Sequence, residues 1–329
     1  MKQAELTAAP EILREFLGYM QVVKGKSPNT VWEYYLDLRT FFRYLKQKRG
    51  CAEPGVPLEE ITIEDIDLDF VKQVTLTEVY EYMNYLSVER GNKAAARSRK
   101  VSSLRSYFAY LTNKVNKLSK NPVQELETPK AKKSLPKYLT LEQSLELLAA
   151  VEGPYAERDY CILTLFLNCG MRLSELVGLN LSDVRKGSDS LRIVGKGNKE
   201  RIVYLNEACR DAIDRYIKVR PADGLLDRSA LFISKQKKRI SPKTVQYLVK
   251  KYLGESGLEG SGYSVHKLRH TAATLMYQHG HVDIRVLKEI LGHENLGTTE
   301  IYTHLSSEQM EKAAQSNPLS KVKKRGEKN

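Results

Sequence analysis

The sequence predicts a mainly α protein: an N-terminal domain of four or five helices, followed by an α+β domain of helices with a small antiparallel β-sheet. Three observations predict this. Apolar residues recur at helical spacing through most of the chain, a proline- and lysine-rich segment interrupts it near residue 130, and two β-branched runs later flank a glycine-rich turn. A length of 329 residues agrees with two domains.

The N-terminal part contains the apolar spacing of four long helices. We expect them at residues 10–23, 28–48, 77–90 and 92–115, with a short helix near 64–71. Ser27 followed by Pro28 is typical of a helix start, because serine caps the helix and proline suits its first position. The buried faces should contain these residues: Ile12, Leu13, Phe16, Leu17 and Met20, then Val31, Leu38, Phe41, Phe42 and Leu45, and finally Val101, Leu104, Phe108 and Leu111.

A connection at residues 50–74 contains alternating acidic residues. Asp65, Asp67 and Asp69 have the spacing of a calcium loop, but Phe70 and Leu76 stand where such a loop needs glycine and glutamate. We therefore expect a solvated acidic connection.

Residues 128–138 are predicted to be a basic linker, because they combine two prolines with four lysines. An alternative is that Lys130, Lys132 and Lys133 form a basic strap along a phosphate backbone. The predicted organisation is a helical domain at 1–127, this linker, a second domain at 139–318 and a basic tail at 319–329.

The second domain is predicted to be helical around one hairpin. Strands are expected at 190–194 and 201–205, and helices return from residue 264. The other helices are expected at 141–151, 157–168, 174–179, 207–220 and 242–256.

Charge and cysteine content narrow the class of protein. Lys and Arg number 53 against 40 acidic residues, a net charge of +13 that favours a polyanionic partner such as nucleic acid over a merely basic soluble protein. The four cysteines form no CxxC pair, so neither a zinc knuckle nor a disulfide framework is expected. Cys161 and Cys169 lie in apolar sequence and are predicted to be buried thiols. Without a signal peptide or a transmembrane run, we expect a cytoplasmic protein.

All six histidines fall between residues 266 and 304, and three basic groups there share a helix face. His266, Arg269 and His270 are spaced i, i+3, i+4. Lys267 stands where a metalloprotease helix has glutamate, so we expect no metal. Clustered cationic donors suit an oxyanion such as phosphate. The alternative is that these residues only brace the helix.

Arg172 is predicted to lie in a turn between a helix that stops at Gly170 and one capped by Ser174, with Glu175 holding its guanidinium. A helix N-terminus there also favours an anion, although a surface Arg–Glu pair is the alternative. Lys196 lies at the hairpin tip, where it is either solvated or a proton donor to a phosphate oxygen.

Two further candidates follow near the C-terminus. Gly292 ends an apolar helix and exposes His293, and Tyr302 follows nine residues later. With 19 tyrosines in the chain, a packed core tyrosine is the alternative for Tyr302.

The order Arg172, Lys196, HKLRH at 266–270, LGH at 291–293 and Tyr302 closely resembles the tyrosine recombinase (phage integrase) family, most nearly its two-domain Xer type. SPNTVWEYYLDLRTFFRYL and RSRKVSSLRSYFAYL resemble the helical core-binding domain with which that family clamps DNA. The 50–74 connection looks longer than in minimal members, and an additional N-terminal arm-binding domain is not apparent.

The resemblance implies site-specific recombination through a 3′-phosphotyrosyl intermediate. Tyr302 would be the nucleophile. Arg172, Arg269, His266 and His293 would stabilise the phosphate oxygens, Lys196 would protonate the leaving 5′-oxygen, and Glu175 and His270 would support them. DNA contacts are expected from these basic residues: Arg97, Arg99, Lys100, Arg105, Lys130, Lys132 and Lys133. Neither metal, ATP nor another cofactor is needed.

The resemblance also implies a homo- or hetero-tetramer on two double-stranded DNA sites, with a division-associated DNA translocase as a further partner. The role that we expect is resolution of chromosome or plasmid dimers. The alternatives are an integrase or excisionase of a mobile element, a type IB topoisomerase, a non-catalytic DNA-binding protein and a metal-dependent nuclease.

Overall fold

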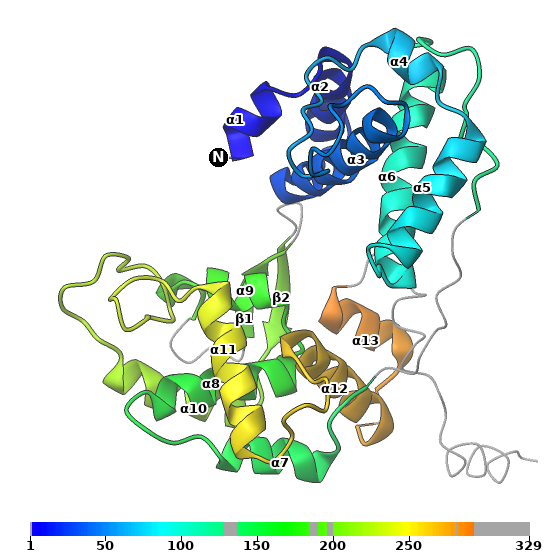
Figure 1. The fold of residues 1–329 in the computed structure, drawn as a ribbon. Helices are drawn as coiled ribbons and strands as arrows, with labels where there is room; N and C mark the ends of the chain where they lie inside the picture. The colour runs from blue at the N-terminus through cyan, green and yellow to red at the C-terminus, as the bar shows by residue number, and fades with distance from the viewer. Residues whose placement is uncertain (1, 128–136, 185–189, 196–199, 281, 293–329) are drawn as a thin grey trace, which may run out of the picture. The chain divides into compact units, whose positions relative to one another are not determined.

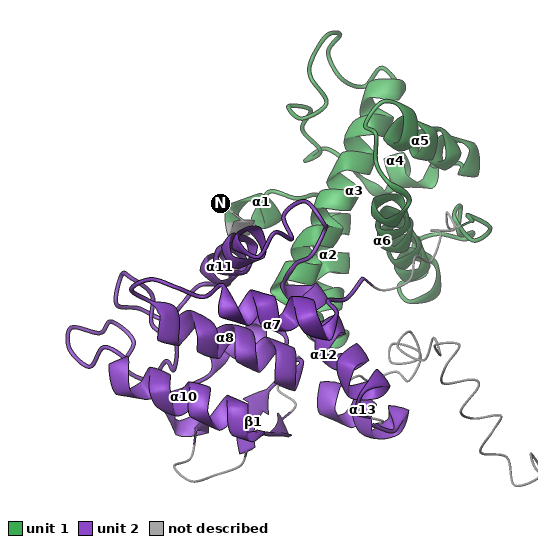
Figure 2. Cartoon of the chain, turned by 90° about the horizontal axis from the view of Figure 1, so that it is seen from below, with its two compact units in different colours: residues 1–133 green, residues 134–329 purple. Residues whose placement is uncertain are grey.

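The computed structural model describes residues 2–127, 137–184, 190–195, 200–280 and 282–292. The chain divides into two compact units, Met1–Lys133 and Ser134–Asn329 (Figures 1 and 2). Each unit has its own apolar core. The architecture is mainly helical with one two-stranded antiparallel sheet, which confirms the predicted fold class. Among the described residues, none of the helices combines the length and the apolar character needed to cross a bilayer.

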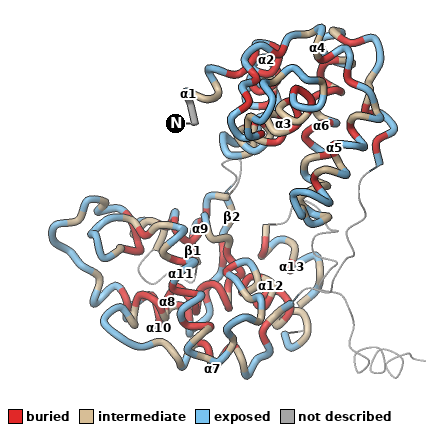
Figure 3. Tube along the Cα trace, in the orientation of Figure 1, coloured by how far each residue is buried: buried red, intermediate tan, exposed pale blue. Residues whose placement is uncertain are grey.

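Unit 1 is built around the long helix α3, against which α2, α5 and α6 pack. Its described helices are α1 (Lys2–Thr7), α2 (Glu11–Gly18), α3 (Pro28–Lys48), α4 (Leu68–Lys72), α5 (Leu76–Val88) and α6 (Ala94–Asn113). Helix α3 starts as predicted, because the Ser27 hydroxyl accepts a hydrogen bond from the Thr30 N–H at 3.3 Å and Pro28 takes the first position. All fourteen apolar residues predicted for the buried faces are buried (Figure 3).

A buried carboxylate also joins α3 to α6. Asp37 is 2% exposed. It accepts hydrogen bonds from Arg99 Nη1 at 2.6 Å, Lys100 Nζ at 2.9 Å and Ser103 Oγ at 2.8 Å. The charge is therefore paired, as a buried charge must be.

Unit 2 is centred on α8, which packs against α7, α10 and α12 (Figure 2). Its described helices are α7 (Leu141–Ala149), α8 (Ala156–Cys169), α9 (Leu173–Gly178), α10 (Glu207–Val219), α11 (Pro242–Glu255), α12 (Val265–Gln278) and α13 (Ile284–Leu291). The predicted thiols of Cys161 and Cys169 are buried and free.

The predicted hairpin is formed by β1 (Ser190–Val194) and β2 (Glu200–Tyr204). Its register pairs Leu191 with Val203 and Ile193 with Arg201. Leu191, Ile193 and Val203 are buried, so this face of the hairpin packs on the core.

Several local expectations need correction. The helix expected at 10–23 changes to a π-helical turn over Tyr19–Val23, the short helix expected at 64–71 occupies Leu68–Lys72, and helix α1 was not predicted. The acidic connection is solvated as predicted, because the side chains of Asp65 and Asp69 are 66% and 76% exposed, and its aspartates also have protein partners. Asp65 pairs with Lys46 at 2.7 Å, Asp67 caps α4, and Asp69 pairs with Lys72 at 2.9 Å.

Candidate active site

The turn between α8 and α9 positions Arg172. Gly170 ends α8 with φ +58°, and a Cβ at this position would lie 2.8 Å from Leu291 Cδ2, so glycine provides both the backbone conformation and the space. The predicted cap Ser174 is wrong, because Arg172 itself is the N-cap of α9. The reason is Glu175, whose carboxylate accepts the Arg172 backbone N–H at 2.7 Å and so fixes the start of α9 two residues earlier than predicted.

Helix α12 positions His266, Arg269 and His270. The His266 and His270 rings are in edge-to-face contact, with centroids 4.6 Å apart. Arg269 is 3% exposed and donates from Nη1 to the Gly170 carbonyl at 2.6 Å and from Nη2 to the Leu291 carbonyl at 2.7 Å. The Arg269 guanidinium of α12 therefore joins the α8–α9 turn to the end of α13.

Arg172, His266 and Arg269 line one hollow of about 670 Å³. Three of the six predicted catalytic residues, far apart in sequence, are thus brought to one place. The polar lining also includes Ser174, Gln246, Lys250, Tyr263 and Ser264. Arg172 also donates from Nη2 to the Gly292 carbonyl at 2.7 Å. Two guanidinium groups and an imidazole at one hollow suit an oxyanion such as phosphate.

The other three predicted catalytic residues, Lys196, His293 and Tyr302, lie outside the described residues. The described chain ends next to two of these positions. Gly195 follows β1, and Gly292 ends α13 with φ +64°.

Glu175 is held as a carboxylate within this network. Burial alone raises its pKa, but hydrogen bonds from Arg201 and Arg172, together with the charge of Arg201, lower the pKa to about 2. Glu175 therefore stays ionised at any pH at which the protein would be assayed. The predicted role of Glu175, holding the Arg172 guanidinium, matches the 2.8 Å contact from Arg172 Nη1 to Oε1.

The two histidines of α12 are held neutral. Burial lowers the pKa of His266, and the charges of Arg269, Lys267 and Arg172 lower it further. Burial likewise lowers the pKa of His270 to about 4, with the same direction of effect from His266, Lys267 and Arg269. Both shifts favour the uncharged imidazole at neutral pH.

Arg201 was not among the residues predicted for the site. This residue of β2 donates from Nη1 and Nη2 to the two oxygens of Glu175, at 2.6 and 2.8 Å. The sequence did contain a hint that Arg201 faces the core, because Arg201 lies on the same face of the strand as the apolar residues Val203 and Leu205. The alternation alone could not show which face of the hairpin is buried.

The predicted DNA-binding residues of α6 make contacts within unit 1. Arg97 donates to Ser87 Oγ at 2.9 Å and to the Asn92 carbonyl at 2.6 Å. Arg99 and Lys100 hold Asp37, and Arg105 donates to the Leu126 carbonyl. The side chain of Arg99 is 45% exposed, whereas that of Lys100 is 12% exposed. The linker residues Lys130, Lys132 and Lys133 lie outside the described residues.

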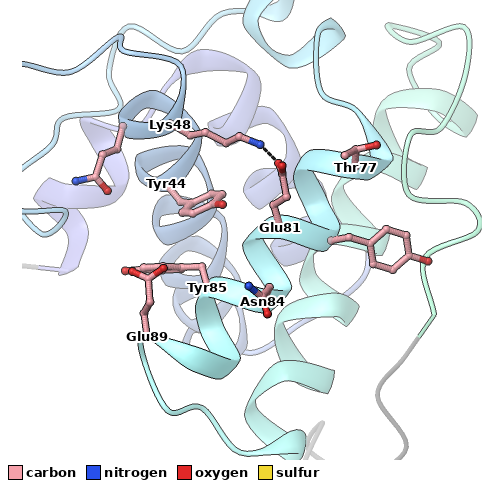
Figure 4. Close-up of a pocket in the computed structure, with 9 residues that line it drawn as sticks. Tyr44, Lys48, Thr77, Glu81, Asn84, Tyr85 and Glu89 are labelled. Carbon is pink, nitrogen blue, oxygen red and sulfur yellow. Dashed lines mark ion pairs between the residues drawn. The ribbon is translucent and has the colours of Figure 1, made fainter.

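A separate hollow of about 730 Å³ lies between α3 and α5 of unit 1 (Figure 4). Tyr44, Lys48, Glu81, Tyr85 and Glu89 are among its lining residues, and Lys48 forms an ion pair with Glu81. As far as the described residues go, its lining includes none of the predicted catalytic residues.

Comparison with known proteins agrees with this geometry. The phage integrase family matches residues 137–309, and the phage integrase N-terminal SAM-like domain matches residues 13–114. Tyrosine recombinase XerC of Caldanaerobacter subterraneus subsp. tengcongensis is 55% identical over 94% of this chain and 88% of its own. Tyrosine recombinase XerD of Proteus mirabilis is 34% identical over 91% of this chain and 90% of its own.

A solved structure shares the fold. The XerH site-specific recombinase, bound to palindromic difH substrate in a post-cleavage complex, matches with a TM-score of 0.67 and 21% identity, covering 93% of this chain and 94% of its own. The family matches, and the identity to XerC and XerD over nearly the whole chain, show that this protein belongs to the phage integrase family and is a tyrosine recombinase of the Xer type.

Proposed function

We propose that this protein cuts and rejoins DNA at a specific site through a covalent bond between Tyr302 and a DNA 3′-phosphate. The observation that carries the proposal is the meeting of Arg172, His266 and Arg269 at one hollow. Donors preorganised around the place where charge develops are usually the largest single contribution to such a reaction.

The proposed step exchanges one phosphoester for another. The Tyr302 phenol oxygen attacks the scissile phosphorus, the bond from phosphorus to the 5′-oxygen breaks, and Lys196 gives its proton to that leaving oxygen. Arg172, Arg269 and His293 stabilise the non-bridging oxygens. Because the phosphotyrosyl bond keeps the phosphoester energy, rejoining by the reverse attack of a 5′-hydroxyl needs neither ATP nor a metal.

His266 is proposed to take the proton of the Tyr302 phenol in addition to binding a phosphate oxygen. An ordinary phenol has a pKa near 10, so it needs a base or a strongly cationic site to react at neutral pH. The lowered pKa of His266 favours the uncharged ring, which is the form that a base must have before it takes a proton.

The biological role that we propose is Xer-like resolution of chromosome or plasmid dimers in the cytoplasm, by a homo- or hetero-tetramer on two DNA sites. Identity of 55% to a XerC over 94% of this chain supports it. A division-associated DNA translocase is proposed as the further partner. Of the α6 residues expected to contact DNA, Arg99 and Arg105 are exposed, whereas Arg97 and Lys100 are half-buried.

The test is covalent trapping on a nicked suicide substrate that carries the recombination site. The wild-type protein should give an SDS-resistant protein–DNA band, and Tyr302→Phe should bind the DNA without giving that band. Tyr204→Phe is the matched control, because Tyr204 is 79% exposed on β2 and should leave trapping intact. A band retained by Tyr302→Phe would remove Tyr302 from the role of nucleophile, and DNA binding without trapping by the wild type would favour a non-catalytic DNA-binding protein.

A two-site assay then separates the proposed role from its alternatives. Recombination between two directly repeated chromosomal sites is expected. Relaxation of supercoiled DNA without strand exchange would favour a topoisomerase, and exchange only between the ends of a mobile element would favour an integrase.

A further inference from the structure

Arg201 is a basic side chain on the buried face of the hairpin. It pairs with Ile193 across the strands, and its side chain is only 14% exposed. A buried charge is costly unless it is paired and hydrogen-bonded. The carboxylate of Glu175 pairs with this charge and accepts from both terminal nitrogens of Arg201, whereas the buried Nε has no hydrogen-bond partner among the described residues.

The same carboxylate also holds Arg172. Glu175 accepts the backbone N–H of Arg172 at 2.7 Å and its Nη1 at 2.8 Å. The side chain of Glu175 is 2% exposed, whereas that of Arg172 is 35% exposed. Arg201 is therefore hydrogen-bonded to Glu175, and Glu175 in turn holds the Arg172 guanidinium at the hollow.

A second contact links Arg201 to Arg172 through Gly292. The Gly292 carbonyl accepts from Arg172 Nη2 at 2.7 Å. Arg201 packs so closely against Gly292 that a Cβ there would lie 3.1 Å from Arg201 Cδ and 3.2 Å from Nη1. Both acceptors of the Arg172 guanidinium, Glu175 and Gly292, are thus in contact with Arg201.

We infer that Arg201 is a positioning residue for Arg172: it fixes the Glu175 carboxylate and packs against Gly292, and these two acceptors orient the Arg172 guanidinium toward the scissile phosphate. The inference rests on the proposed function, in which Arg172 binds the phosphate. Arg201 itself touches neither the substrate nor the reacting atoms in this role.

Removal of Arg201 should change the titration of Glu175. The hydrogen bond from Arg201 is the strongest of the influences that lower the pKa of Glu175 against the effect of burial. Without it, the pKa of Glu175 should rise, so that protonation would release Arg172 at a higher pH than in the wild type. A residue needed only for folding would not move the acid side of the pH profile in this way.

The experiment is a double-mutant cycle on the rate of adduct formation, measured in single turnover at saturating suicide substrate. The variants are Arg201→Met, Arg172→Ala and the double variant, with Arg215→Met as the matched control because Arg215 is an exposed arginine of α10 paired with Glu157. Arg201→Met should slow the reaction by less than the about 10²–10³-fold typical of losing a donor itself. In the Arg172→Ala background, Arg201→Met should have little additional effect, because its target is already gone.

Arg201→Lys keeps the charge but lacks the two-pronged guanidinium, so it should recover part of the rate. It also serves if Arg201→Met fails to fold, which urea unfolding of each variant would reveal. The inference is overturned if the Arg201 and Arg172 effects multiply, if the pH profile of Arg201→Met keeps the wild-type acid side, or if Arg201→Met reacts as fast as Arg215→Met. An inactive wild type would instead overturn the proposed function.

Discussion

Two buried carboxylates, Asp37 in unit 1 and Glu175 in unit 2, are each held by two basic side chains, and each has a side chain that is 2% exposed. They differ in what their partners can still do. Lys100, beside Asp37, is 12% exposed and its contact joins two helices of one core. Arg172, beside Glu175, is 35% exposed and lines the hollow with His266 and Arg269.

A basic residue near a buried acid can therefore have one of two functions. It can pair with the acid only, in which case it contributes to stability. It can also be oriented by the acid while other donors remain available to a ligand, in which case it contributes to chemistry. The positive charge of Lys100 and Arg172 does not by itself show which function each has. Four substitutions test the assignment.

The largest effect is expected from Asp37→Ala. Its removal leaves Lys100 without its buried partner, and breaking a buried ion pair in this way costs about 3–5 kcal/mol of the free energy of unfolding. Urea unfolding measures it, with the exposed Asp69→Ala as the control, because Asp69 forms only a surface pair with Lys72. A loss no greater than that of Asp69→Ala would show that the Asp37 cluster is not a stabilising element.

Arg172→Ala should have a comparable effect on rate and a small one on stability. Losing one donor at a developing oxyanion slows the reaction by about 10²–10³-fold, which corresponds to about 2.7–4 kcal/mol. Glu175 keeps both bonds from Arg201, so the core loses little. Single-turnover trapping and urea unfolding together check this. A large loss of stability with an unchanged rate would reverse the contrast with Asp37.

Ser103→Ala should have a smaller effect on unit 1. Ser103 is fully buried and donates to Asp37 at 2.8 Å, and a hydrogen bond to a charged group contributes about 1.5–3 kcal/mol. Asp37 retains Arg99 and Lys100, so we expect the lower end of this range in urea unfolding. Ser102→Ala is the neighbouring control, because Ser102 is exposed and its hydroxyl donates only to the Ser98 carbonyl. Equal losses from the two variants would contradict the prediction.

At neutral pH, His270→Gln should have the smallest effect of the four, because its consequences are confined to acidic pH. Burial is the main reason that the pKa of His270 falls to about 4 in the folded protein, compared with an ordinary value of 6.5. Between these values the unfolded chain binds a proton that the folded chain does not, so stability falls as pH decreases from 6.5 to 4. His270→Gln should flatten this fall in urea unfolding, whereas the exposed His279→Gln should keep it. An unchanged slope in His270→Gln would refute the assignment.

The sequence was sufficient for most of the helices because their signals are local. Ser27 and Pro28 mark the start of α3 through contacts within four residues, and the apolar spacing of α2 and α6 identifies the faces that are buried. Local signals failed at Arg172, because helix α9 begins there and not at Ser174, and the Glu175 carboxylate accepts the Arg172 backbone N–H. Because Glu175 lies inside α9 and bonds back to its N-cap, Ser174 and Arg172 were both possible helix starts in the sequence.

The candidate site was partly predictable. The spacing of His266, Arg269 and His270 places them on one helix face without any knowledge of the rest of the chain. Arg201 was not identified, because its importance depends on a pairing across 26 residues with Glu175. The basic residues of α6 were assigned by charge alone, and their internal partners, such as Asp37, come from a different helix.

Most of the helices, the hairpin and the motifs could be read from the sequence, because capping, periodicity and glycine turns act over a few residues. Which basic side chains meet at the hollow, and which form ion pairs inside a unit, depended on the tertiary structure. The physical reason is that a guanidinium or ammonium group takes its role from the acceptors within hydrogen-bond distance, and folding brings those acceptors from distant parts of the chain.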